Sequence, residues 1–393
     1  MNNIIDYVRT YGKFSLDEEN FNEVDSLVLS QFSYLKFDDI LNENKDHHIY
    51  ISELKSSNKY ETLFSDERFK NLNKELLEEM IISRRFSNMG IFEYVNLVDP
   101  NWEIQFSAIT CVFDNGFVYV VYRGTDETLT GWKEDFNMSF ICPVPAQIKA
   151  VQYLNRVTSG TTAPVTIGGH SKGGNLAIYA AMMCEDSVKK RITNIYSHDG
   201  PGFTSGIIES AEFKMIKDRI KKTVPRSSIV GMLFDTMDDY DVVICKNFGF
   251  LQHDPFNWLV NGKIFKRTDD INRHTKVRNL SVNRWIENME YDKRQEFVDL
   301  LFDILRGSGS DDLNDFKNHP LETGHNIKKR VDLMDKSDRK IFSDLLKDMS
   351  RIFKETSKEF MVSQMEEEKG KYKKLIDDFI NKLDEYIEKY IKG

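Results

Sequence analysis

The sequence predicts an α/β fold, in which a mostly parallel sheet is flanked by helices. Between residues 104 and 265, segments rich in β-branched and aromatic residues alternate with segments of helical periodicity. Such alternation is typical of βαβ units, whose strands pair in parallel. Hydrophobic residues make up 40% of the 393 residues, which is enough for a large core and excludes a wholly disordered chain.

The expected elements follow in order. Residues 1–95 are predicted to form a helical cover, and within it Phe21, Val24, Leu27, Val28 and Phe32 recur at the three- and four-residue steps that share a helix face. The core sheet is expected over residues 104–265. Its strands are predicted at 106–113, 117–122, 165–167 and 192–196, with a turn at 114–116 and helices at 146–157 and from residue 173 onward.

A change of composition near residue 307 predicts a second part of the chain. Residues 1–306 are expected to form one domain and residues 311–393 a charged helical extension, in which Pro320 is the last proline. Its end carries one apolar stripe: Tyr372, Leu375, Ile376, Phe379, Ile380, Leu383, Tyr386, Ile387, Tyr390 and Ile391. We expect this stripe to pack on the protein itself or on a second copy, and membrane contact is less favoured because acids share the polar face.

Charge and cysteine content exclude several classes of protein. The chain has 54 Lys and Arg against 63 Asp and Glu, a net charge of −9, so nucleic-acid binding is not expected. Its four cysteines form no CxxC pair and are interpreted as small core residues. No dinucleotide, P-loop or zincin motif occurs, so no cofactor or metal is predicted. The N-terminus lacks a leader pattern and no 18-residue apolar run occurs, so we expect a cytoplasmic protein.

The most informative segment is Gly169-His170-Ser171-Lys172-Gly173, between a predicted strand and a predicted apolar helix. This GxSxG pattern in that setting predicts a nucleophile elbow, a sharp turn that presents a serine hydroxyl. Ser171 is then the candidate nucleophile, and the backbone N–H of Lys172 is half of a candidate oxyanion hole. We expect the Lys172 side chain to face solvent.

Two motifs in this order resemble class-3 lipases, the fungal triacylglycerol type. Residues 169–177 are similar to their serine elbow, where leucine is usual in place of Lys172, and residues 120–126 are similar to their oxyanion strand. The closest resemblance is to a bacterial branch of uncharacterised α/β-hydrolase-like proteins related to these lipases, over roughly residues 1–265. It implies an α/β-hydrolase-type fold, Thr125 as the second oxyanion donor and a lid over residues 129–140.

A serine nucleophile needs a histidine base, and eight histidines are available. The chain order serine, acid, histidine excludes His47, His48 and His170. His253 follows a strand-like segment and is favoured. His274 is the alternative, because class-3 lipases place their histidine further along the chain. The others are interpreted as structural: His198, His319 and His325.

The acid that orients the histidine is predicted to be Asp199. It follows the strand expected at 192–196 and precedes a Gly-Pro turn, which is where a triad acid belongs. Class-3 lipases carry their acid after the next strand, but the segment here that corresponds, residues 224–230, has serine instead. The alternatives that remain are Asp235, Asp238, Asp239 and Asp241. Asp254 is too close in sequence to His253 to orient it.

The sequence therefore predicts a serine hydrolase that cleaves a lipid-like or other acyl ester through an acyl-enzyme, with Ser171, His253 and Asp199 as the triad. One alternative is a catalytically silent lipase-like protein that binds a partner through its C-terminal helix. Another is a thioesterase or peptidase on the same scaffold, because a triad does not select the leaving group.

Overall fold

The computed structural model describes residues 2–41, 48–65, 69–126, 128–138, 141–234, 239–247, 249–307 and 320–363, with 377–378, 380–382 and 384–385. These residues form two compact units. The first comprises Met1–Thr125 and Pro143–Ile271, and the second comprises Asp126–Cys142 and Asn272–Gly393. This division differs from the one expected near residue 307, because residues 272–307 and the segment 126–142, which contains the predicted lid, group with the C-terminal helices.

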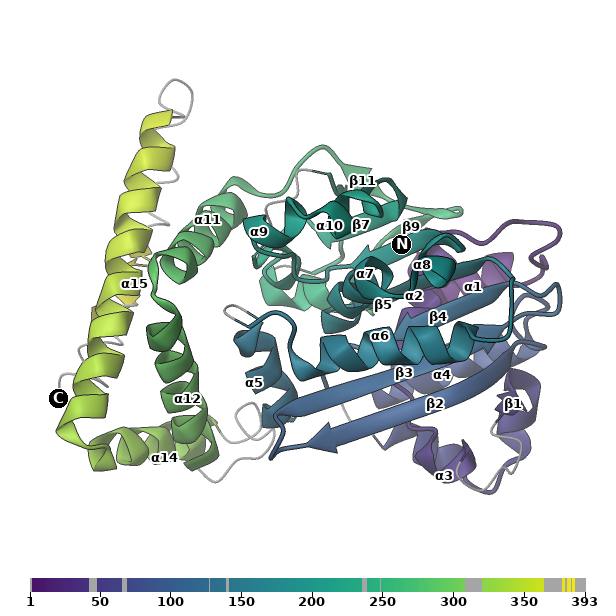
Figure 1. The fold of residues 1–393 in the computed structure, drawn as a ribbon, viewed down its shortest axis with the longest axis horizontal. Coiled ribbons are helices and arrows are strands. Elements are labelled where there is room, and N and C mark those ends of the chain that lie inside the picture. Colours follow the sequence, from purple (N-terminus) through teal and green to yellow (C-terminus); the bar gives the residue numbers. More distant parts are fainter. Residues whose placement is uncertain are drawn as a thin grey trace. The chain divides into compact units, whose positions relative to one another are not determined.

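The first unit contains a nine-stranded sheet, in the order β1-β2-β3-β4-β5-β6-β7-β8-β11 (Figure 1). The central strands are parallel: β4 (Val118–Tyr122), β5 (Val165–His170), β6 (Ile192–His198), β7 (Ile220–Pro225) and β8 (Asp241–Val243). Antiparallel strands extend both edges: β1 (His48–Tyr50), β2 (Gly90–Asp99), β3 (Ile104–Val112) and β11 (Arg267–Thr268). The α/β prediction is confirmed. The sheet begins earlier in the chain than expected, since β1 and the first part of β2 lie within the predicted helical cover.

Helices cover both faces of this sheet. Successive residues of a strand point to opposite faces, so each strand contributes side chains to both helical layers. From β3 and β4, Ile109, Cys111, Tyr119 and Val121 share one core cluster with α1 (Ile4–Tyr11), α2 (Glu23–Phe32) and α4 (Lys70–Ile82). The other face meets α6 (Pro145–Thr158) and α7 (Lys172–Met183). There, the Tyr122 hydroxyl donates to the Ala150 carbonyl at 3.0 Å. The expected helix and strand positions between 104 and 198 are thus confirmed within a few residues.

The N-terminal helices are fixed by polar contacts as well as by their apolar faces. Asn3 and Asn22 cap α1 and α2 through capping boxes, which satisfy amide groups that the first turn leaves unpaired. Within this layer, Arg85 forms two hydrogen bonds with the Asp25 carboxylate, at 2.6 and 2.5 Å, and both side chains are buried. Tyr7 also donates to Asp25, at 2.9 Å. A buried ion pair of this kind is stable only while both partners are present.

Short elements connect the larger ones in the first unit. Between α2 and β2 lie α3 (Asp38–Leu41) and two 3₁₀ helices, η1 (Ile51–Ser56) and η2 (Tyr60–Phe64). After α7 follow α8 (Asp186–Lys189), α9 (Ser205–Ile208), α10 (Ala211–Lys214), η3 (Lys217–Arg219) and η4 (Val230–Met232). After β8 follow η5 (Gly249–His253), η6 (Pro255–Asn257) and a small hairpin of β9 (Val260–Asn261) and β10 (Ile264–Phe265).

The second unit is helical. It contains α5 (Leu129–Asn137), α11 (Arg273–Asn288), α12 (Tyr291–Gly307), α14 (Pro320–Leu333) and α15 (Lys336–Ser363). A separate apolar cluster holds it together and includes Leu129, Trp285 and Phe302. The Lys133 ammonium also meets the Asp299 carboxylate at 2.7 Å, which joins α5 to α12. The predicted C-terminal stripe lies outside the described residues except for Ile380, which is buried.

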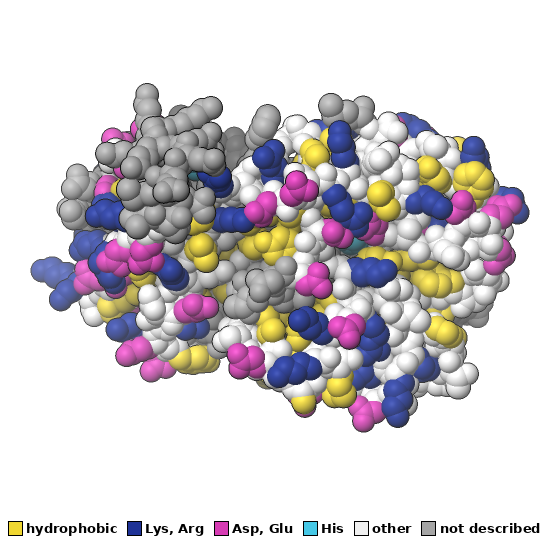
Figure 2. Space-filling model, turned by 90° about the horizontal axis from the view of Figure 1, so that it is seen from above, with side chains coloured by type: hydrophobic (Ala, Val, Ile, Leu, Met, Phe, Trp, Pro, Cys, Tyr) yellow, Lys and Arg dark blue, Asp and Glu magenta, His cyan; other side chains and the backbone are white. Residues whose placement is uncertain are grey.

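Charged side chains of both signs are interspersed over the face shown in Figure 2, as the near balance of acids and bases in the sequence suggests. Among the described residues, no helix is both long and apolar enough to span a membrane. The cysteines differ from the expectation in part: Cys111 and Cys184 are buried, but Cys142 is exposed.

Candidate active site

The candidate elbow lies where β5 ends and α7 begins. Ser171 occupies the turn with a φ of +57°, a conformation that is strained for a residue with a side chain. The two glycines of the motif let the chain approach closely. A Cβ on Gly173 would lie 2.1 Å from the Tyr122 carbonyl oxygen, and one on Gly169 would lie 2.4 Å from the Gly173 backbone. The tight strand-to-helix turn expected here is therefore present, and its glycines are sterically required.

The backbone of Ser171 is held on both sides. Its N–H donates to the His198 carbonyl at 2.9 Å, and its own carbonyl accepts from the Gly174 N–H at 2.9 Å. The side chain is largely enclosed, with 7% of the residue exposed. Because Ser171 precedes the first residue of α7, the amide groups of that helix point toward it, and this end of a helix favours negative charge.

His253 and Asp199 are in direct contact. The His253 Nδ1 lies 2.6 Å from the Asp199 Oδ2, and both residues are buried. The other carboxylate oxygen accepts from the Ser228 hydroxyl at 2.5 Å and from the Gly231 N–H at 3.1 Å. Three neighbours thus hold the Asp199 carboxylate in place, as the orienting acid of a serine–histidine pair requires.

The segment that carries His253 is anchored by its neighbours. The Gln252 side-chain oxygen accepts from the Ser227 N–H at 2.7 Å, and the Gln252 carbonyl accepts from the Trp258 indole N–H at 2.9 Å. On the elbow side, the His170 Nε2 donates to the His253 carbonyl at 2.8 Å, and the two imidazole rings lie 4.5 Å apart. His253 is thus packed against the residue that immediately precedes Ser171.

Thr125 lies at the carboxyl end of β4 and is buried. A Cβ on the preceding residue, Gly124, would lie 3.0 Å from the Ser171 Cβ, so this turn passes directly beside the elbow. The turn is anchored below by the buried Arg123, whose Nη2 donates to the Asn96 side chain at 3.0 Å. Thr125, Ser171 and Asp199 therefore follow adjacent parallel strands at the carboxyl edge of the sheet, where open α/β sheets bind ligands.

The family model for Mbeg1-like proteins matches residues 80–303, which is more than half of the chain. The chain belongs to the Mbeg1-like family. No curated protein matches it. Among solved structures, a deletion mutant of the Rhizomucor miehei lipase in a propeptide complex is 16% identical, with a TM-score of 0.32 over 50% of this chain and 67% of that one. M37 lipase is 15% identical, with a TM-score of 0.31 over 54% of this chain and 70% of that one.

One expectation about the motif of this Mbeg1-like chain is wrong. The Lys172 side chain does not face solvent: it is 1% exposed, and its ammonium donates to the Gln105 carbonyl at 3.0 Å. The reason is that α7 lies against the sheet, so the first residue of the helix extends over β3. The expected role of the Lys172 backbone N–H does not depend on this side chain.

His198 is a further buried polar residue beside the site. Its ring nitrogens lie 2.8 Å from the Ser26 hydroxyl and 2.7 Å from the Thr223 hydroxyl. Burial lowers the pKa of His198 to about 3, because the charged imidazolium would lose its solvation. His198 is therefore a neutral structural histidine, as expected. Its partner Ser26 precedes the region that the family model matches, and no sequence pattern identified it.

The other histidines are distributed as follows. His274 belongs to the second unit, where it is exposed at the start of α11, and partial burial lowers its pKa. His48 stacks on Phe92 in the antiparallel edge of the sheet, and His325 is exposed on α14. His47 and His319 lie outside the described residues.

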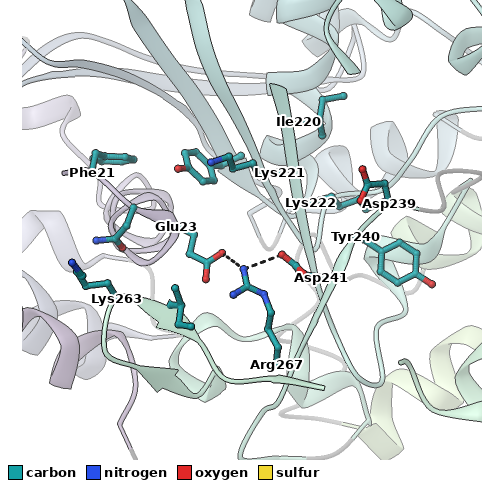
Figure 3. Close-up of a pocket in the computed structure, with 13 residues that line it drawn as sticks. Phe21, Glu23, Ile220, Lys221, Lys222, Asp239, Tyr240, Asp241, Lys263 and Arg267 are labelled. Atoms are coloured by element: carbon teal, nitrogen blue, oxygen red, sulfur yellow. Dashed lines mark hydrogen bonds and ion pairs between the residues drawn. The ribbon is translucent and has the colours of Figure 1, made fainter. Parts of the chain in front are cut away.

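The alternative acids that the structure describes, Asp239 and Asp241, lie at the start of β8, two strands from β6. Asp241 begins β8, and its carboxylate meets Arg267 at 2.9 Å. Figure 3 shows this pair in a cavity of about 470 Å³, where Arg267 also contacts Glu23 and Asp239 lies nearby. Asp235 and Asp238 are outside the described residues.

Among the residues that the structure describes, no group of three or more His, Cys, Asp or Glu side chains is placed to hold a metal ion. The chemistry that the carboxyl edge offers is that of the serine hydroxyl, the imidazole and the carboxylate. Helix α5, which covers part of the expected lid, belongs to the second unit, so the lid stays a prediction.

Proposed function

We propose that this protein is a serine hydrolase that cleaves a carboxylic ester, lipid-like or another acyl ester, through an acyl-enzyme. The observation that carries the proposal is the 2.6 Å contact between the His253 Nδ1 and the Asp199 carboxylate, with His253 packed on the residue before Ser171. Membership of the Mbeg1-like family and the strained elbow support the same conclusion.

In the proposed first half-reaction, the Ser171 hydroxyl attacks the acyl carbon while the His253 Nε2 takes its proton. Asp199 accepts the Nδ1–H, which fixes the tautomer that leaves Nε2 as the base and stabilises the imidazolium once it forms. The carbonyl oxygen becomes an oxyanion, and the backbone N–H groups of Thr125 and Lys172 receive it.

The tetrahedral intermediate then collapses. The bond to the leaving oxygen breaks, the imidazolium returns its proton to that oxygen, and the alcohol departs from an ester of Ser171. In the second half-reaction, His253 deprotonates a water molecule that attacks this acyl-enzyme. Release of the carboxylic acid regenerates the serine hydroxyl.

A fluorophosphonate probe tests this proposal, because it reacts only with an activated serine. The wild-type chain should be labelled at Ser171 and Ser171→Ala should not, while Ser205→Ala, an exposed serine on α9, should be labelled as well as the wild type. Hydrolysis of p-nitrophenyl esters of increasing chain length would then define the acyl group. Equal labelling of Ser171→Ala, or labelling at another residue, would contradict the proposal.

A labelled serine with no turnover of any ester would favour the thioesterase, peptidase or silent alternatives. The same panel should therefore include a thioester and a peptide anilide. Hydrolysis of the thioester or the anilide, with no hydrolysis of the esters, would assign a different leaving group. The three residues would keep their proposed roles.

A further inference from the structure

Tyr34 reaches the candidate active site from outside the region that the family model matches. It lies just beyond α2, in a turn where its N–H donates to the Gln31 carbonyl at 3.1 Å. The apolar residues around it, Phe32, Leu35 and Phe37, are all buried. The position of the tyrosine is thus fixed by the core, although its own side chain is only partly buried.

The Tyr34 hydroxyl lies at the meeting point of the elbow and the oxyanion turn. A Cβ on Gly124 would be 2.2 Å from the Tyr34 hydroxyl oxygen, 2.6 Å from the His170 carbonyl oxygen and 3.0 Å from the Ser171 Cβ. The Tyr34 hydroxyl oxygen and the Ser171 Cβ both lie within 3.0 Å of this one Cβ position, so the hydroxyl lies beside Ser171. Gly124 directly precedes Thr125, the proposed oxyanion donor of that turn.

The hydroxyl can serve as a donor in this position. Its contact with the His170 Nδ1 is 3.5 Å, which is long for a hydrogen bond, and a phenol hydrogen can rotate toward a closer acceptor. A phenol keeps its proton near neutral pH, so it can donate to a developing oxyanion without changing its own charge. Donors that are already in place gain most from the charge that appears in the transition state.

We propose that the Tyr34 hydroxyl is a third hydrogen-bond donor to the carbonyl oxygen of the bound ester, beside the N–H groups of Thr125 and Lys172. The inference rests on the proposed hydrolase function and adds a catalytic residue to it. The bond strengthens as the oxygen becomes an anion, so Tyr34 acts on the rate of acylation more than on substrate binding.

Tyr34→Phe in the full chain tests this, because it removes the hydroxyl and keeps the ring. We expect kcat on an ester to fall about 10- to 100-fold, as for the loss of one hydrogen bond to a charged group, with KM within about threefold. The fluorophosphonate labelling rate should fall in parallel, since the phosphoryl oxygen gains negative charge in the same hole as the serine attacks and fluoride leaves. Tyr50→Phe, an exposed tyrosine on β1, is the control and should match the wild type.

A second replacement separates donation from structure. 3-Fluorotyrosine at position 34 keeps the hydroxyl and makes it a stronger donor, so kcat should stay at or above the wild-type value even if Tyr34→Phe lowers the melting temperature. A kcat of Tyr34→Phe within twofold of the wild type would overturn the inference, and so would a change in KM alone. A shifted midpoint of the pH–rate profile would also overturn it, because it would mean that Tyr34 only positions His170 and His253.

The outcome for Tyr34 is distinguishable from that for the function. If Ser171 is labelled and Tyr34→Phe reacts as fast as the wild type, only the role of Tyr34 fails. If Ser171→Ala is labelled as readily as the wild type, the hydrolase proposal fails and the role of Tyr34 fails with it.

Discussion

The Ser228 hydroxyl donates to the Asp199 carboxylate across 2.5 Å. Ser228 lies in the segment after β7 where class-3 lipases were expected to carry their acid, whereas Asp199 follows β6. The serine at the expected position thus supports an acid that comes from the neighbouring strand. Ser228 and His253 thus hold the two oxygens of the same carboxylate.

Asp199→Asn should separate this acid from the alternatives. An amide can hold the imidazole in the wrong tautomer, so kcat should fall by about 10⁴-fold while the chain stays folded. Asp241→Asn is the matched control, since its exposed carboxylate pairs with Arg267, and it should retain wild-type activity. Steady-state ester hydrolysis measures both. Loss of activity in Asp241→Asn but not in Asp199→Asn would assign the acid to Asp241.

Gly173→Ala should damage the elbow. The added methyl would meet the Tyr122 carbonyl oxygen at 2.1 Å, so either α7 or β4 must shift and the serine must move with it. We expect a melting temperature several degrees lower and loss of fluorophosphonate labelling. Gly206→Ala has no atom within 4 Å of the new methyl and should keep both properties. Normal labelling of Gly173→Ala would mean that the close approach is not required.

His198 predicts an acid-sensitive fold. Its pKa is about 3 in the folded chain against about 6.5 when unfolded, so the unfolded state binds a proton that the folded state rejects. Protonation of His198 does not lower the free energy of unfolding above about pH 6.5. Between pH 6.5 and pH 3 it lowers this free energy by up to about 1.4 kcal/mol per pH unit. His198→Asn lacks this proton, so its melting temperature should fall less steeply than that of the wild type over that range. Parallel curves for the two proteins would refute the assignment.

Arg85→Met should destabilise the N-terminal layer. It leaves the buried Asp25 carboxylate without its bidentate partner, which costs about 3–5 kcal/mol of unfolding free energy. Arg84→Met is the adjacent control, because Arg84 is exposed and its contact with Glu18 contributes at most about 1 kcal/mol. Urea unfolding measures the difference. An equal loss of unfolding free energy in the two variants would show that the buried pair stabilises the fold no more than the exposed pair does.

The sequence predicted those parts of the fold whose cause is local. The elbow could be found because its GxSxG pattern lies between a strand-like and a helix-like segment, and β4 because it is apolar almost throughout and four of its five residues are buried. Strand β2 was missed, since Glu93 adopts a φ of +56° at a bulge that interrupts its alternation.

What the sequence could not predict depends on contacts between distant segments. The burial of Lys172 results from its bond to Gln105, 67 positions away, and the position of Tyr34 beside Ser171 spans 137 positions. Neither partner forms a pattern with the other along the chain. His253 and Asp199 were predicted from order and strand position, but only the folded geometry brings the imidazole against the carboxylate.

The hydrogen bond between Ser26 on α2 and His198 on β6 joins an N-terminal helix to the central sheet. This limits where the chain can be truncated for experiments. A fragment cut at the limits of the family match, residues 80–303, would lack α1, α2 and most of α4, which cover one face of the sheet. Water would then reach a large apolar surface, and such a fragment should aggregate or misfold when expressed by itself. A useful truncation would have to retain the chain from its first helix.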